Sequence, residues 1–280
     1  MLSKRRSQRV SRALAGLPCL AALIPLVTTR PAPAAERWFA FVDEAQLVGP
    51  GDAELEPWTT LRAGREHYYS DVEQRLGFEF GILSNFEGAL AWHGRSSAED
   101  APRDVEGNPV RRNDTALAAA SLALTYKLAD RLADVIGLAL RAEGGYGPSQ
   151  AAVRGRLILD EQSRHGLFAL NLAGEHVWRQ PNPSSRWSGT DVELGVAAGY
   201  LASPLVVLGL EAVNTTRIDD GEVANSRIHL GPSFGYASER YWFSLAVLPQ
   251  VFAPESSTDE SLDLEQGEYL RARVRMGFRL

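Results

Sequence analysis

Large apolar residues alternate with small or charged residues along most of this chain, with a period of two. The end of the chain shows the pattern most clearly: Leu270, Ala272, Val274, Met276, Phe278 and Leu280 alternate with Arg271, Arg273, Arg275, Gly277 and Arg279. Successive side chains of a β-strand point to opposite faces, whereas a helix would mix these two sets. The alternation therefore predicts a strand with one apolar and one basic face.

The same alternation recurs in residues 72–82, 118–128, 192–200, 205–213 and 226–236. In each segment small, polar or charged residues share one face and mostly large apolar residues share the other. A soluble barrel would bury its large apolar residues, whereas a membrane barrel turns them to lipid. Glycine and charge on one face favour a water-filled lumen, and an arginine on the lipid face would cost about 2–4 kcal/mol at the bilayer midplane.

The strands and the breaks between them predict about twelve strands. They span residues 57–66, 71–82, 86–94, 114–128, 135–146, 151–161, 167–178, 190–201, 205–214, 226–237, 241–252 and 268–280. Longer polar connections lie at 95–113, 179–189, 215–225 and 253–267, and most of the other connections are short. Bacterial single-chain barrels have an even number of strands, with short periplasmic turns and longer outer loops. The expected fold is an all-β, transmembrane, antiparallel up-and-down β-barrel over residues 57–280, with both termini on the periplasmic side.

One nearly continuous apolar stretch, residues 195–213, offers a membrane helix as the alternative. Ser203-Pro204 interrupts this stretch, and proline inside a helix costs about 3 kcal/mol. Glu211 would also lie within the bilayer. Two strands joined by a short turn therefore explain the stretch better.

Aromatic residues gather at two levels along the expected strands. Those at the short-turn ends are Phe80, Phe86, Tyr126, Phe168, Tyr200, Tyr236, Tyr241, Trp242 and Phe278, and those at the opposite ends are Trp92, Tyr146, Trp178, Phe252 and Tyr269. The two interfaces of a membrane select amphipathic rings at two such levels, which a soluble core does not require. The aromatic residues therefore favour the membrane barrel.

The N-terminus has the layout of a secretory signal peptide over residues 1–34. A basic start precedes an apolar stretch of about 15 residues, which ends before the small-x-small signal Ala32-Pro33-Ala34. A transmembrane anchor is the weaker alternative, because a spanning helix needs about 20 apolar residues. Residues 35–56 are expected to form an N-terminal periplasmic segment. Their apolar residues Trp38 and Phe39 suggest either a short periplasmic element or a segment tucked into the barrel mouth.

Charge and cysteine content exclude several classes of function. Residues 1–34 hold six Lys or Arg and no acid, so the remaining chain has 23 Lys+Arg against 35 Asp+Glu, a net charge of −12. Nucleic acid is therefore not expected as a partner, because phosphate binding needs clustered positive charge. The single cysteine, Cys19, leaves with the signal peptide, and no spacing of ligands suggests a metal site or a cofactor.

The final strand resembles the carboxy-terminal assembly signal of Gram-negative outer-membrane proteins, with alternating apolar residues up to the terminus. The departure is Leu280, because these proteins usually end in Phe. Residues 54–62, Glu-Leu-Glu-Pro-Trp-Thr-Thr-Leu-Arg, are similar to the start of a group of uncharacterised porin-like or transporter-like outer-membrane barrels. The resemblance implies export to the outer membrane, insertion by the barrel-assembly machinery, and contact with the lipid bilayer and lipopolysaccharide. We expect a monomer.

Charged residues on the inward face are the candidate site. They are Arg62, Glu73, Arg75, Glu79, Arg141, Glu143, Arg154, Arg156, Glu175, Glu193, Glu211, Arg271, Arg273 and Arg275. One hypothesis places the arginines of the last strand with Arg62 in a basic wall, opposite an acidic wall from residues 167–214, so that a pore or transporter filters small charged or polar solutes. The alternative is that the same charges pair across a narrow interior and form a closed structural or surface-interaction barrel.

An outer-membrane lipid hydrolase is the less favoured alternative. Such enzymes need a serine and a histidine arranged on the outer wall of the barrel. None of the five histidines lies in a recognisable nucleophile motif. The sequence therefore assigns no catalytic residue and predicts that the protein is not an enzyme.

Overall fold

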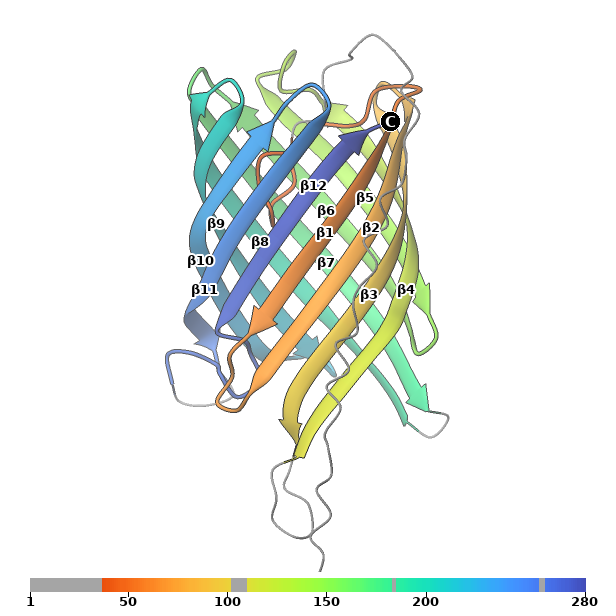
Figure 1. Ribbon diagram of the computed structural model, residues 1–280, viewed down its shortest axis with the longest axis vertical. Coiled ribbons are helices and arrows are strands. Elements are labelled where there is room, and N and C mark those ends of the chain that lie inside the picture. Colours follow the sequence, from red (N-terminus) through yellow and green to blue (C-terminus); the bar gives the residue numbers. More distant parts are fainter. Residues whose placement is uncertain (1–36, 102–109, 183–184, 257–259) are drawn as a thin grey trace, which may run out of the picture.

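The computed structural model describes residues 37–101, 110–182, 185–256 and 260–280, which form a closed antiparallel barrel (Figure 1). Its strands are β1 (Ala53–Ala63), β2 (Tyr69–Leu83), β3 (Phe86–Ala101), β4 (Val110–Ala129), β5 (Ile136–Gly147), β6 (Gln150–Gln162), β7 (Gly166–Asn182), β8 (Ser185–Ser203), β9 (Val206–Asp219), β10 (Glu222–Ala237), β11 (Tyr241–Glu255) and β12 (Leu270–Arg279). Each strand pairs with its neighbours in the chain, and β12 closes on β1. The expected all-β, up-and-down barrel of twelve strands is confirmed. The expected signal peptide lies outside the described residues.

The two ends of the barrel differ. At the terminal end β1 begins and β12 ends (Figure 1). At the loop end β2 to β11 extend beyond their predicted limits, whereas β1 ends at Ala63 and β12 begins at Leu270, both short of theirs. Residues 215–225, predicted as a loop, are mostly strand, and β9 and β10 meet at a tight turn of Asp220 and Gly221 with φ of 53° and 87°. Ladder hydrogen bonds form between polar residues as readily as between apolar ones, so strand length exceeds the apolar length. A prediction based on hydropathy therefore ends these strands several residues too early.

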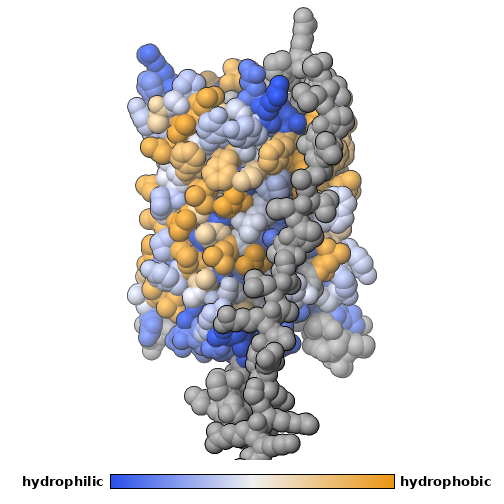
Figure 2. Space-filling view, viewed as in Figure 1, coloured by the Kyte–Doolittle hydropathy of each residue, from blue (hydrophilic) through white to orange (hydrophobic). Residues whose placement is uncertain are grey.

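The side-chain alternation agrees with the predicted faces. On β12, Arg271, Arg275 and Gly277 are buried inside, while Met276 and Phe278 are exposed on the outer wall. Hydrophobic residues cover much of the middle of that wall, and hydrophilic residues gather towards its ends (Figure 2). No helix among the described residues is long and apolar enough to cross a membrane.

Most of the aromatic residues assigned to the two belts are exposed on the outer wall, among them Tyr126, Tyr200, Trp92 and Trp178. Trp242 was assigned to the terminal-end belt, and this assignment is wrong. Its side chain points inward with 1% exposure, and its Nε1 donates a hydrogen bond to Glu54 Oε1 at 2.7 Å. Trp242 lies in register with Ala237 and Gly277, both buried, which fixes its inward direction.

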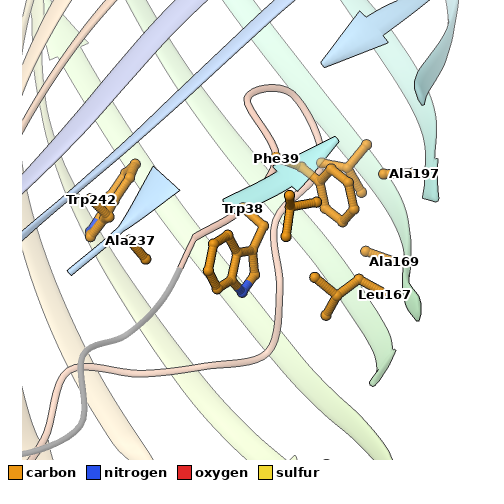
Figure 3. Packing of buried hydrophobic residues seen from close by; sticks show 9 residues of the cluster. Trp38, Phe39, Leu167, Ala169, Ala197, Ala237 and Trp242 are labelled. Carbon is orange, nitrogen blue, oxygen red and sulfur yellow. The ribbon is translucent and has the colours of Figure 1, made fainter. Parts of the chain in front are cut away.

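Residues 37–52, which we call the N-terminal segment, precede β1 and enter the barrel interior (Figure 1). Trp38, Phe39 and Val42 are fully buried, and they form a cluster with side chains from the inner wall (Figure 3). The wall residues of this cluster are Leu167, Ala169, Ala197, Val207, Ala237 and Trp242. The apolar core of the molecule is therefore inside the barrel, near its terminal end.

Inward-facing glycines make room for this segment. A Cβ at Gly235 would lie 2.5 Å from Trp38 O, and a Cβ at Gly81 would lie 2.0 Å from Gly49 O. Both distances are shorter than any real carbon contact, so a larger residue would displace the segment. The glycines on the polar face of β2 and β10 therefore mark the path of the segment as well as a lumen.

Candidate functional site

The charged residues selected from the sequence all take inward-facing positions on their strands. Arg62 is on β1, Glu73, Arg75 and Glu79 on β2, Arg141 and Glu143 on β5, Arg154 and Arg156 on β6, Glu175 on β7, Glu193 on β8, Glu211 on β9, and Arg271, Arg273 and Arg275 on β12. Within this set the structure pairs opposite charges that lie one to three strands apart, such as Arg62 with Glu73, Arg154 with Glu193 and Arg141 with Glu79.

The hypothesis of separate basic and acidic walls is wrong. Arg275 lies 2.7 Å from Glu56 on the adjacent β1, and Arg62 lies 3.0 Å from Asp71 and 2.9 Å from Glu73 on β2. The sequence interpretation started β1 at residue 57 and so left Glu56 out of the barrel. The alternation Glu54-Glu56-Trp58-Thr60-Arg62 was the signal that would have included both acids.

The opposite side of the barrel is mixed in the same way. Arg154 Nη2 lies 2.9 Å from Glu193 Oε1, and Arg154 Nη1 lies 3.8 Å from Glu175 Oε2. Nearer the loop end, Arg217 Nη1 lies 2.8 Å from Asp191 Oδ2. Positive and negative charges therefore alternate around the interior and compensate one another locally.

Glu211 anchors the N-terminal segment through its backbone. Its carboxylate accepts hydrogen bonds from the N–H groups of Ala40, Phe41 and Val42, at 2.8, 2.6 and 3.1 Å. The Glu211 side chain is fully buried. A carboxylate that accepts several N–H bonds in a dry site makes short, charge-assisted contacts, so Glu211 fixes the innermost turn of the segment.

Asp43 provides a second anchor on the same turn. Its carboxylate contacts Arg156 and lies 2.8 Å from Arg275 Nη1. The backbone of Asp43 also makes two hydrogen bonds with the amide of Asn171, at 2.7 and 2.8 Å. The segment thereby joins β6, β7 and β12 across the interior.

The two ends of the segment are held by acids of β2 and β3. Arg37 Nη2 lies 2.8 Å from Glu79 Oε2, and the Val48 N–H donates to Glu87 Oε2 at 2.8 Å. Within the segment, Glu44 accepts the N–H of Trp38 at 2.7 Å. Burial raises the pKa of Glu44 to about 7, while that hydrogen bond and the charge of Arg131 act in the opposite direction.

The interior therefore has two parts. In the terminal half the segment fills the space and charged side chains such as Glu79 and Glu211 are excluded from solvent. In the loop half inward side chains such as Glu73 and Glu193 retain about a quarter of their exposure, 28% each, so solvent reaches them. Other charges of the loop half, such as Asp71 and Arg271, are buried. The solvent-accessible charges Glu73, Arg154, Glu175 and Glu193 therefore line a vestibule along part of the wall, and it ends at the N-terminal segment.

No group of three His, Cys, Asp or Glu side chains among the described residues is arranged to hold a metal ion. Ser121 does contact a histidine and an acid: its Oγ lies 2.9 Å from His93 Nε2 and donates to Glu143 Oε1 at 2.6 Å. In a Ser–His–acid triad the acid binds the histidine instead of the serine. This group also lies inside the barrel rather than on the lipid-facing wall, so it offers little support for a lipid hydrolase.

Two solved structures show the same architecture. An outer membrane channel from Pseudomonas putida F1 is similar over 83% of this chain and 97% of that chain, with a TM-score of 0.58 and 9% identity. The translocator domain of the autotransporter NalP from Neisseria meningitidis is similar over 83% and 90%, with a TM-score of 0.51 and 12% identity. No protein-family model and no curated protein matches the chain. The chain has the fold of a bacterial outer-membrane barrel. Identities this low show the fold alone, and the two similar structures have different functions.

Proposed function

We propose that this chain is an outer-membrane channel for small polar or charged solutes, with the N-terminal segment as the constriction of its path. The observation that carries the proposal is the vestibule of solvent-accessible charges in the loop half, which ends at a segment that is not part of the barrel wall. The similarity to an outer membrane channel supports the proposal. The chain would work as a monomer in the outer membrane, in contact with lipid and lipopolysaccharide, and we assign it no enzymatic step.

Single-channel conductance in planar bilayers tests this function. The purified, folded protein should give small conductance steps, and replacing residues 38–48 by a Gly/Ser stretch of equal length should increase the conductance several-fold. Arg111→Gln, in an exposed pair with Asp100 at the loop end, is the control and should leave conductance unchanged. Folding is verified by the shift in gel migration on boiling.

The second candidate is a closed structural barrel, which the dense ion pairs and the buried segment favour. A silent bilayer with both the folded full-length protein and the Gly/Ser variant would support the closed barrel and contradict the channel. Hydrolysis of phospholipid vesicles by the purified protein would contradict both.

A further inference from the structure

Three guanidinium groups surround one indole ring, that of Trp58 on β1. The Cζ atoms of Arg75, Arg273 and Arg275 lie 4.6, 4.7 and 5.1 Å from the centre of the Trp58 ring. The strand register explains the cluster, because Trp58 is paired with Arg75 on β2 and with Arg275 on β12, and Arg273 is two residues away. Three positive charges around one ring repel one another unless anions compensate them.

Arg275 is compensated within the protein. It donates from Nε to Glu56 at 2.9 Å and from Nη1 to Asp43 at 2.8 Å. Its positive charge is therefore neutralised by two carboxylates that are also buried.

Arg75 lacks such partners, although its side chain is 4% exposed. The nearest carboxylate oxygen is Glu143 Oε1 at 3.9 Å from Nη2, which is beyond hydrogen-bond distance, and Glu143 Oε1 already accepts from Ser121 at 2.6 Å. Within the described chain, Nε and Nη2 of Arg75 and Nε1 of Trp58 are buried without a hydrogen-bond partner. Buried donors of this kind are rare because each unsatisfied group costs free energy.

Arg273 has no carboxylate oxygen within 4.0 Å among the described residues, and it is part-buried. Its Nε donates to Thr60 Oγ1 at 2.8 Å, and its guanidinium lies 4.3 Å from the ring centre of Phe41 in the N-terminal segment. Arg273 therefore lies where the open loop half meets the segment. The nearby inward acids form ion pairs with other arginines, Glu73 with Arg62 and Glu193 with Arg154.

We propose that Arg75, Arg273 and Trp58 form a binding site for a small monocarboxylate at the inner end of the vestibule. The proposal rests on the proposed channel function and names the class of solute that the channel selects. A guanidinium presents parallel N–H groups that fit a planar carboxylate, and the unsatisfied donors of Arg75 and Trp58 would gain acceptors. Glu143 beside Arg75 limits the positive charge of the site, so a single negative charge fits better than the phosphate dianion.

Binding is measured on the folded protein in detergent by intrinsic fluorescence during titration with sodium acetate, against sodium chloride at equal ionic strength. The expected result is a saturable change that Trp58→Phe abolishes. Arg75→Gln and Arg273→Gln should each weaken binding about tenfold or more, the effect of losing a charge-assisted hydrogen bond. Arg111→Gln should stay within about twofold of the wild type. Arg75→Lys keeps the positive charge but loses the paired N–H donors of the guanidinium, so its affinity should resemble that of Arg75→Gln.

Three results would overturn the site: no saturable response to acetate, an equal response to chloride or phosphate, or unchanged affinity in both glutamine variants. Should Arg75→Gln fail the gel-migration check for folding, Arg273→Gln decides the question, because Arg273 is part-buried and has no ion pair to lose. Acetate binding by a barrel that does not conduct would support the binding site and contradict the proposed channel function. Conduction without acetate binding would support the channel function and contradict the binding site.

Discussion

Glu211 and Glu193 lie on adjacent strands, both point inward, and nothing in the local sequence distinguishes them. In the structure Glu211 is fully buried and holds the backbone of the N-terminal segment, whereas Glu193 keeps 28% exposure and pairs with Arg154. The difference comes from the N-terminal segment, which covers Glu211 and leaves Glu193 in contact with solvent. The expected role of these two inward acids therefore depends on whether the segment covers them.

The largest effect is expected for Asp43→Ala in the terminal half. This change leaves Arg156 and Arg275 buried without their shared carboxylate, and breaking one partner of a buried ion pair costs about 3–5 kcal/mol. The N-terminal segment should detach, so that a protease cleaves it in folded protein and conductance rises. A segment as resistant to protease as in the wild type would show that Asp43 is not an anchor.

A smaller effect in the same half is expected for Glu211→Gln. The amide keeps one oxygen acceptor for three N–H groups, so about 1–3 kcal/mol of docking free energy should be lost. Protease protection of the segment should fall by roughly 5- to 150-fold, the equivalent of this loss. Gel migration before and after boiling should remain that of a folded barrel, because the change does not touch the strand ladder.

The matched change in the loop half is Glu193→Gln. Because Glu193 and Arg154 are part-exposed, their pair contributes about 1 kcal/mol or less. Protease protection should stay close to that of the wild type, while the proposed channel should shift towards anion selectivity as one negative charge leaves the vestibule. Reversal potentials in a salt gradient measure this shift. A loss of protection equal to that of Glu211→Gln would remove the distinction between the two halves.

The smallest effect concerns pH and Glu44. With the pKa of Glu44 raised from 4.5 to about 7 by burial, the docked segment binds a proton more tightly than the free one. This contribution to docking is fully present below pH 4.5 and is lost as pH rises through 7. Between pH 5 and pH 8 protease protection should therefore fall more in the wild type than in Glu44→Gln. Comparing the two proteins separates Glu44 from the neighbouring Arg37, Arg131 and Asp160.

The barrel itself could be predicted from the sequence, because lipid and water impose opposite demands on alternate residues. The pattern of β12 fixes its register in this way, and the structure agrees. Strand ends at the loop end could not be predicted, since β9 and β10 continue beyond the apolar length. Trp242 was misplaced because an inward aromatic residue beside the N-terminal segment and an outward one beside lipid give the same apolar signal.

The sequence predicts which charged residues face inward, but it does not predict which of them form ion pairs. Arg273 and Arg275 are neighbours on one face of β12 with the same sequence signal, yet Arg275 has two carboxylates and Arg273 has none within 4.0 Å among the described residues. The difference depends on Glu56, which the strand assignment excluded, and on Asp43, which comes from a segment without periodicity. Contacts between distant parts of the chain decide such pairings, and a pattern of period two carries no information about them.

Arg275 contributes both to the closure of the barrel and to the docking of the N-terminal segment. Its guanidinium binds Glu56 across the junction of the first and last strands and binds Asp43 within the enclosed segment. The side chain that joins β12 to β1 therefore also holds the N-terminal segment in the interior. A barrel without β12 would be open between β1 and β11, and it would also lose the Arg275 contact that holds Asp43 of the segment.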